Sequence, residues 1–191
     1  MGNTYWRCCR RRSSLLCAER ASQLVEFAIA LPLLVVLVVG IFDFGGALNL
    51  KGQLTNAARE GAHLASTLPI TDIGGPSTPP ITVSAVQNLV DSYLLRSEIN
   101  DCGLGSASLV VGASAYSWTA QTNTGCAGNL TLTIDRAYMF RENSIDVICA
   151  HIEISYPYQW RFNSVIQLLI PGANYGAPIQ ITADSIMPNM H

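Results

Sequence analysis

The feature that most constrains this chain is an uninterrupted apolar run near its N-terminus. From Phe27 to Phe42, no side chain carries a charge or a hydrogen-bonding group. A run with this composition is unstable on a protein surface in water, because nothing offsets the exposure of its apolar side chains. The run therefore lies in lipid or is buried inside an assembly.

The helical pattern continues beyond the apolar run. Apolar and small residues recur at spacings of three and four along one helix face: Leu54, Ala57, Ala58, Gly61, Leu64 and Ala65. The other face carries polar residues: Asn56, Arg59, Glu60 and His63. We therefore predict one long helix over residues 22–68, of which about residues 24–48 span a membrane and contact lipid.

Small side chains along this helix predict close packing. Ala57, Gly61 and Ala65 are each four residues apart, and this spacing allows either another helix or the chain's own domain to approach closely. Within the apolar run, Pro32 removes a backbone donor and favours a kink. Pro32 and Gly40 complete the set of predicted helix-packing positions.

Two carboxylates flank the apolar run. Glu26 lies at its start, where desolvating an unpaired charge costs roughly several kcal/mol, so a partner of opposite charge is expected. The alternative is that Glu26 lies among lipid headgroups as an ordinary flanking residue. Asp43 follows the run at its other end, and we interpret it as an interfacial anchor rather than a proton relay.

The distribution of charge predicts the orientation of the chain. Residues 1–21 contain five arginines and one glutamate, a net charge of +4, so the net charge of −2 for the whole chain leaves −6 on residues 22–191. A basic leader before an apolar helix predicts a cytoplasmic N-terminus and an exported C-terminal domain. The basic run from Arg10 to Arg12 is explained better by this rule than by nucleic-acid binding.

Four short motifs follow one another in the N-terminal part of the chain. They are Val25-Glu26-Phe27-Ala28, Leu31-Pro32, Gly40-Ile41-Phe42-Asp43-Phe44-Gly45 and Asn56-Ala57-Ala58-Arg59-Glu60-Gly61-Ala62. In this order they resemble the signature of the TadE-like family of pseudopilins. The resemblance implies a minor pilin or pseudopilin that supports assembly of a Flp-type (tight adherence) pilus. The implied partners are a prepilin peptidase, other pilin or pseudopilin subunits and the pilus assembly platform.

The resemblance also implies single-pass insertion in the inner membrane and processing on its cytoplasmic side. Aligning Glu26 with the fifth mature position places the cleavage between Ala21 and Ser22, with Ala21 where the family usually has Gly. The new amino group of Ser22 would then pair with Glu26 of a neighbouring subunit and set the axial register. A cleavable secretory signal is the rival interpretation. The length of the apolar run, the lack of a clear Ala-x-Ala site after it and the continuing helix argue against that rival.

After the long helix, the composition changes to a linker over residues 69–80, which is rich in Gly, Pro, Ser and Thr. A second helix is predicted to start at Thr82 or Ser84, with Ser84 and Gln87 as a capping box. Beyond it, the pattern predicts strands over residues 109–118, 130–135, 148–156 and 179–186, and a short helix over residues 164–170. The expected fold class is α+β, with a small antiparallel-sheet domain over residues 81–191 and a pilin-like plan.

The cysteines divide between the two sides of the membrane. Three precede the membrane segment and are expected to remain reduced: Cys8, Cys9 and Cys17. The other three are exported, and among them we favour a disulfide between Cys102 and Cys126, because both lie in Gly-rich loop sequence whereas Cys149 lies in a strand. Palmitoylation or metal binding at Cys8 and Cys9 is an alternative, although no Cys-x-x-Cys pair or nearby His supports a metal.

Reactive side chains form no recognisable catalytic motif. His63, His151 and His191 are scattered, and the sequence contains no nucleophile elbow, His-Glu-x-x-His pair or phosphate-binding Gly loop. His151 and Glu153 share a strand face and are interpreted as solvated. We therefore expect no enzyme activity, cofactor, metal, nucleic acid or small-molecule substrate. The alternative to a pilus subunit is a single-pass membrane-anchored extracytoplasmic binding or accessory protein that does not enter a filament.

Overall fold

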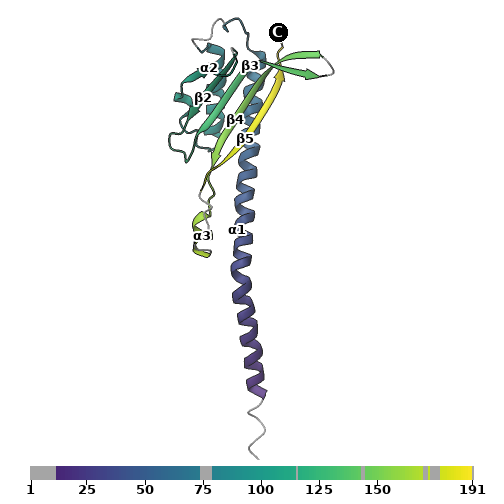
Figure 1. Ribbon diagram of the computed structural model, residues 1–191, viewed down its shortest axis with the longest axis vertical. Coiled ribbons are helices and arrows are strands. Elements are labelled where there is room, and N and C mark those ends of the chain that lie inside the picture. Colours follow the sequence, from purple (N-terminus) through teal and green to yellow (C-terminus); the bar gives the residue numbers. More distant parts are fainter. Residues whose placement is uncertain are drawn as a thin grey trace, which may run out of the picture.

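The computed structural model describes residues 12–73, 79–114, 116–142, 145–169, 172 and 177–190. One long helix carries an α+β domain at its C-terminal end (Figure 1). The elements in chain order are α1 (Arg12–Thr67), α2 (Ile81–Arg96), the short 3-10 helix η1 (Leu104–Ser106), β1 (Leu109–Val111), β2 (Ser117–Thr122), β3 (Leu130–Glu142), β4 (Ile145–Tyr158), α3 (Asn163–Leu169) and β5 (Ile179–Pro188). The expected α+β class with an antiparallel sheet is confirmed.

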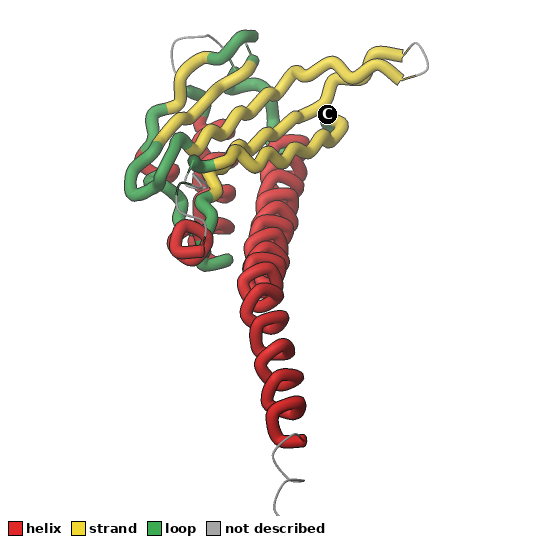
Figure 2. Tube along the Cα trace, turned by 60° about the horizontal axis from the view of Figure 1, so that its bottom comes forward, coloured by secondary structure: helices red, strands yellow, loops and turns green. Residues whose placement is uncertain are grey.

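The five strands form one sheet in the order β1-β2-β3-β4-β5, in which each strand is antiparallel to its neighbour. The register between β3 and β4 shifts between Asp135 and Tyr138, as in a β-bulge. Beyond this shift, β3 and β4 continue as a two-stranded hairpin that projects past the rest of the sheet (Figures 1 and 2).

The core lies between the sheet and two helices that cover the same face, α2 and the C-terminal half of α1 (Figure 2). The inward-facing strand residues Leu132, Ile134, Ile152 and Ile154 are fully buried. Because alternate side chains of a strand point to opposite faces, their two-residue spacing leaves one covered face and one polar face. The alternation in the sequence therefore predicted which strand residues form the core.

α1 is one helix of 56 residues, about 84 Å long at the usual helical rise. It begins at Arg12, earlier than the predicted start at residue 22, because residues 13–21 contain good helix formers and no Gly or Pro. The helix continues through Pro32, which lacks the N–H that the preceding turn would use. Its end at Thr67 lies next to the predicted end at residue 68.

The start of α2 differs from the prediction. Pro80 is the N-cap, and the capping box predicted for Ser84 and Gln87 is wrong. The side-chain amide of Gln87 is buried and instead donates hydrogen bonds to the carbonyl oxygens of Leu104 and Ala107, at 2.7 and 2.8 Å. Gln87 therefore connects α2 to the loop before β1 rather than stabilising the start of its own helix.

A carboxylate from the linker caps α2. Asp72 accepts two hydrogen bonds from Thr82, one from its backbone N–H and one from its hydroxyl, each at 3.0 Å. A negative charge at this position satisfies a free helical N–H and complements the positive end of the helix dipole. The cap is distant in sequence, so the local spacing of residues could not reveal it.

The strand predicted over residues 109–118 is two strands, β1 and β2, joined by a tight turn. The N–H of Gly112 donates to the carbonyl oxygen of Ser117 at 2.7 Å, and Leu109 pairs with Ala120 across the two strands. Gly and Ser are common turn residues, and their presence between the strands explains the reversal.

Candidate assembly interface

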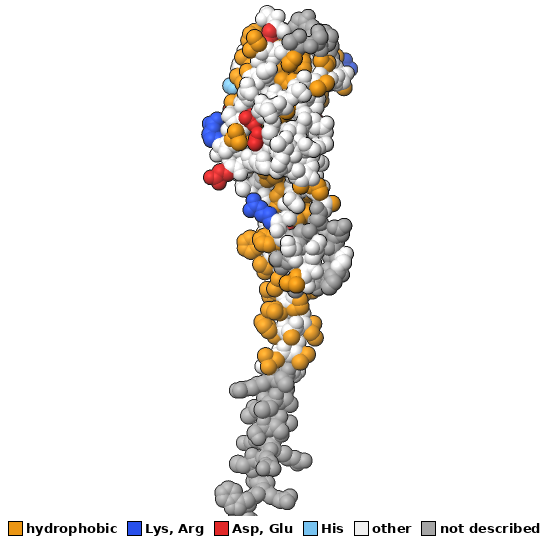
Figure 3. Space-filling view, turned by 90° about the vertical axis from the view of Figure 1, so that its left-hand side faces the viewer, with side chains coloured by type: hydrophobic (Ala, Val, Ile, Leu, Met, Phe, Trp, Pro, Cys, Tyr) orange, Lys and Arg blue, Asp and Glu red, His pale blue; other side chains and the backbone are white. Residues whose placement is uncertain are grey.

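The N-terminal half of α1 exposes its apolar side chains. Phe27 is 63% exposed and Leu48 is 70% exposed. Figure 3 shows an apolar surface along this part of the helix, below the domain. Among the described residues, one helix is long and apolar enough to cross a membrane, Ser22–Thr67. We call residues 22–48 the stem and residues 49–67 the docked half of α1.

Three of the predicted packing and pairing residues lie on the stem. Glu26 and Pro32 are exposed, and no side chain in the described part of the chain pairs with Glu26. A Cβ built on Gly40 would meet no atom within 4 Å, so this position is open to a neighbouring helix. Ala21 and Ser22, which flank the predicted cleavage point, lie within the helical backbone of α1.

The small residues of the docked half contact the chain's own domain. Ala57, Gly61 and Ala65 are buried. A Cβ built on Gly61 would lie 3.1 Å from Cγ2 of Val90 in α2 and 3.6 Å from Cγ2 of Ile152 in β4. Of the two neighbours that the spacing allowed, another helix or the domain, the structure places the domain on this face.

Asp43 connects the stem to the domain through hydrogen bonds. Asp43 is only 3% exposed, and its Oδ1 accepts a hydrogen bond from the backbone N–H of Arg161 at 3.2 Å. The hydroxyl of Tyr158 donates to the carbonyl oxygen of Asp43, also at 3.2 Å. The ring of Trp160 lies edge-on to that of Phe44, with centroids 5.6 Å apart. We call these five residues the lower junction.

Sequence reasoning singled out Asp43 but missed the residues that contact it. The segment from Tyr156 to Phe162 is rich in aromatic residues and contains an arginine, a composition typical of a membrane boundary. That composition could have indicated that this segment lies near the end of the apolar run. The pairing itself was not readable, because Asp43 and Arg161 are 118 residues apart.

A buried arginine closes the other end of the docked half. Nη2 of Arg136 donates to the carbonyl oxygen of Leu68 at 2.8 Å, where its positive charge complements the negative end of the α1 dipole. Burial lowers the pKa of Arg136, and the nearby charge of Asp72 opposes that shift. The N–H of Met190 donates to the carbonyl oxygen of Ser66 at 3.2 Å. These contacts form an upper junction between α1 and the sheet.

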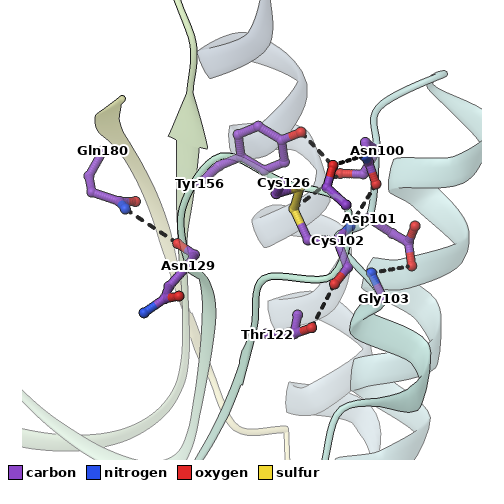
Figure 4. Close-up of a disulfide and its surroundings, with 10 residues drawn as sticks. Asn100, Asp101, Cys102, Gly103, Thr122, Cys126, Asn129, Tyr156 and Gln180 are labelled. Carbon is purple, nitrogen blue, oxygen red and sulfur yellow. Dashed lines mark hydrogen bonds between the residues drawn. A yellow bond between two sulfur atoms is a disulfide. The ribbon is translucent and has the colours of Figure 1, made fainter. Parts of the chain in front are cut away.

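A disulfide closes the loop that follows α2. Cys102 and Cys126 are bonded, with their Cα atoms 5.5 Å apart (Figure 4). The hydroxyl of Tyr156 donates to the carbonyl oxygen of Asn100 at 3.0 Å, and the Asn100 side-chain amide donates to the carbonyl oxygen of Gly125 at 2.9 Å. The two loops and β4 are therefore held together by one covalent bond and several hydrogen bonds.

The third cysteine of the domain, Cys149, is a buried free thiol in β4. Burial raises the pKa of Cys149. A raised pKa reduces the fraction of thiolate at neutral pH, and thiolate is the reactive form. The position of this thiol therefore favours packing over chemistry.

A polar cleft of about 540 Å³ opens between α1 and the domain, next to the lower junction. Asn49 and Gln53 of α1 line one side, and Glu98 and Arg161 line others. Its lining contains Ser97 but no histidine, so the residues described there include no nucleophile with a histidine base. Nor do the described residues contain a cluster of three or more His, Cys, Asp or Glu that could hold a metal. The described lining of the cleft is therefore mainly polar, without these two arrangements.

A second group of polar side chains lies on the outer face of the sheet, around His151. Nε2 of His151 lies 3.8 Å from Oδ2 of Asp184, and the His151 ring lies 4.8 Å from that of Tyr138. Glu153 in β4 is directly opposite Asp184 in β5, so a second acid lies near this pair. These four side chains form a small cluster of charged and aromatic groups on this face.

The fold and the exposed stem define the class of this protein: an α+β domain built on one long N-terminal apolar helix, which is suited to a single membrane anchor. Residues 21–63 match the family of TadE-like proteins, and the chain therefore carries a TadE-like family domain at these residues. The matched region contains the stem, Asp43 and most of the docked half. This family is one of Tad pilus components and is not known for enzymes. A search of curated proteins and a search of solved structures found no match.

Proposed function

We propose that this chain is a minor pilin or pseudopilin that supports assembly of a Flp-type (tight adherence) pilus. It is anchored in the inner membrane by the stem, with its N-terminus in the cytoplasm and its domain outside. The observation that carries this proposal is the exposed apolar stem, which is continuous with a docked half already occupied by the domain. The stem is therefore the part of α1 that remains for contact with lipid or with other subunits.

Assembly then proceeds by helix packing. The stem leaves the lipid and packs against the stems of other subunits, so its apolar side chains stay out of water in both states. The open surface around Gly40 supports close approach of a neighbouring helix. The two junctions hold the domain on α1, so movement of the stem carries the domain with it.

Processing and register depend on Glu26. Cleavage by a prepilin peptidase between Ala21 and Ser22 would create a free amino group at Ser22. The exposed Glu26 of a neighbouring subunit would pair with that amino group when both leave water, because an isolated buried carboxylate is strongly unfavourable. The pair would define how far one subunit is displaced along the fibre from the next.

The test is the intact mass and N-terminal sequence of the protein from native membranes, in cells with and without the prepilin peptidase. A mature N-terminus at Ser22 that requires the peptidase is expected. The Glu26→Gln variant is expected to be processed normally. Its incorporation into fibres should be about 10-fold less efficient than that of wild type, because the variant keeps the side-chain size and loses the charge. Glu60→Gln, on the exposed face of the docked half, is the matched control and should assemble normally.

A second candidate function is a membrane-anchored accessory protein that binds a partner outside the membrane and never enters a filament. The polar cleft next to the lower junction favours this candidate, because it offers a binding surface that helix packing does not use. An uncut chain that still begins at Met1, together with fibres that lack the protein, would support the accessory role. Such a result would contradict the pairing of Ser22 with Glu26.

A further inference from the structure

The chain contains a short helix that the proposed assembly does not use. α3 follows β4 and lies beside α1, on the side of the domain that faces the N-terminus of the stem (Figures 1 and 2). We call residues 160–168 the foot. We propose that the foot lies in the membrane interface, between the lipid headgroups and the acyl chains on the side of the membrane that faces the domain. This inference rests on the membrane anchoring in the proposed function.

The lower junction sets the depth of the foot along the stem. Asp43 is the first charged residue after the apolar run, and its carboxylate holds the backbone N–H of Arg161 at 3.2 Å. The ring of Trp160 lies 5.6 Å from that of Phe44, one residue further along α1. From this point α3 continues beside the apolar part of the stem (Figure 1). A bilayer that covers the stem up to Asp43 therefore reaches the foot as well.

The foot carries the side chains that membrane interfaces favour. Trp160 combines an aromatic ring with a polar atom, and such residues are enriched at the level of the headgroups. Arg161 is exposed next to it, where its positive charge can meet lipid phosphate. Leu168, further along α3, is 82% exposed and would be stabilised by transfer from water to lipid.

Continuity with the stem favours lipid over a protein partner. Ile41, Phe42 and Phe44 are exposed on the stem near the same junction, so stem and foot present apolar side chains at one level. Figure 3 shows apolar side chains gathered on the surface below the domain. Lipid around the stem covers both groups at once, whereas a protein partner would first have to displace lipid from the stem. The domain then has two contacts with the membrane, which restrict the tilt of α1.

The experiment uses tryptophan fluorescence of the full chain in phosphatidylcholine vesicles with brominated acyl chains. Trp6→Phe leaves two reporters, Trp118, which is fully buried in the domain core, and Trp160. We expect the brominated lipid to quench the emission, and the quenched component to disappear when Trp160→Phe is added. Bromine near the headgroup end of the chains should quench more strongly than bromine near their ends.

A pair of matched variants tests the role of α3. Leu168→Asp should reduce the quenching of Trp160 several-fold, because a carboxylate opposes insertion of the foot. Leu95→Asp places the same charge at a leucine on α2 that is 56% exposed, and it should leave the quenching unchanged. Equal quenching in wild type and Leu168→Asp would overturn the insertion of α3.

Extraction of the same vesicles with alkaline carbonate separates this inference from the proposed function. A chain that resists extraction but shows no lipid quenching of Trp160 would overturn the foot and leave the membrane anchor in place. A chain that is extracted would overturn both, because the stem itself would then lie outside the bilayer.

Discussion

The stem and the docked half belong to one continuous helix, yet their surroundings are opposite. In the stem the apolar residues go all the way round the helix, and they remain exposed in the single chain. In the docked half the apolar and small residues form one stripe, and that stripe is buried under α2 and the sheet. The width of the apolar surface around a helix therefore decides its partner: a stripe fits one domain, whereas a fully apolar surface needs lipid or several helices.

The lower junction lies where the exposed part of α1 meets the part that the domain covers. Asp43 directly follows the apolar run, and without the domain its carboxylate would be unpaired at the edge of an apolar surface. The N–H of Arg161 and the hydroxyl of Tyr158 both bond to this residue. The contact satisfies a carboxylate at the place where an unpaired one would be costly.

The largest expected effect comes from the disulfide, which acts on the domain and not on the stem. Replacing Cys102 and Cys126 by Ser should lower the free energy of unfolding of the domain by about 3 kcal/mol, because the bond closes a loop between cysteines 24 residues apart. Urea denaturation of the full chain in detergent, followed by tryptophan fluorescence, measures this loss. Cys149→Ala is the control and should cost much less. Loss of stem helicity in the double variant would show that the two halves of α1 do not behave independently.

The next effect compares two glycines on the same helix. Gly61→Leu should destabilise the domain by about 2 kcal/mol, because its side chain would press on Val90 and Ile152. Gly40→Leu meets open space on the stem and should leave the melting temperature of the domain unchanged. Circular dichroism on heating measures both variants. Equal destabilisation by the two substitutions would contradict the division of α1 into a docked and an open half.

A smaller effect is expected at the lower junction. Asp43→Ala removes the acceptor for the N–H of Arg161 and should destabilise this contact by about 1.5 kcal/mol. Hydrogen exchange at the Arg161 amide should become faster, while exchange in the core strands should change little. Glu60→Ala, on the exposed face of the docked half, is the control. Unchanged exchange at Arg161 would show that the junction does not depend on the carboxylate.

The smallest effect concerns a pair of carboxylates in the domain. Burial, and then the charge of Asp101, raise the pKa of Asp91 above its ordinary value of 3.8, and the N–H of Gly105 opposes this shift. A raised pKa in the folded state means that ionised Asp91 weakens folding at neutral pH, and that this penalty fades as the pH falls through the raised pKa.

Asp91→Asn should therefore stabilise the domain at neutral pH, by less than about 1 kcal/mol because solvent screens the pair. The difference in melting temperature between the variant and wild type should shrink as the pH falls toward 3.8. Thermal denaturation over a pH series measures it, and Asp101→Asn should relieve the same repulsion. A variant that is less stable than wild type at neutral pH would contradict the sign of the shift.

Much of the fold was predictable because its signals are local. The stripe that includes Ala57 and Gly61 indicated an amphipathic helix, and alternation at Ile152 and Ile154 indicated a strand with one buried face. The missed features depend on residues that are distant in sequence, such as Asp72 at the start of α2. The turn that separates β1 from β2 is different, because its signal is local: Gly112 and Ser114, which are common turn residues, lie between the two strands.

The candidate interface likewise has one part that was predictable from the sequence and one part that was not. Composition alone indicated that the stem needs an apolar environment, and Glu26 stood out as a charge that needs a partner. The residues that contact Asp43 were not predictable, because they come from a segment after β4 that only the folded sheet brings back to α1.

The length and apolar character of the stem, the amphipathic docked half and the strand pattern of the domain can all be inferred from the order of amino acids alone. Each of these depends on the periodicity of side chains along a single element, and periodicity is present in the chain before it folds. Three contacts become visible only in the folded chain: Gly61 packs against the chain's own domain, Asp43 is covered, and α3 lies beside the stem. These contacts join segments far apart in the chain, and their geometry follows from how the helices and the sheet pack against one another.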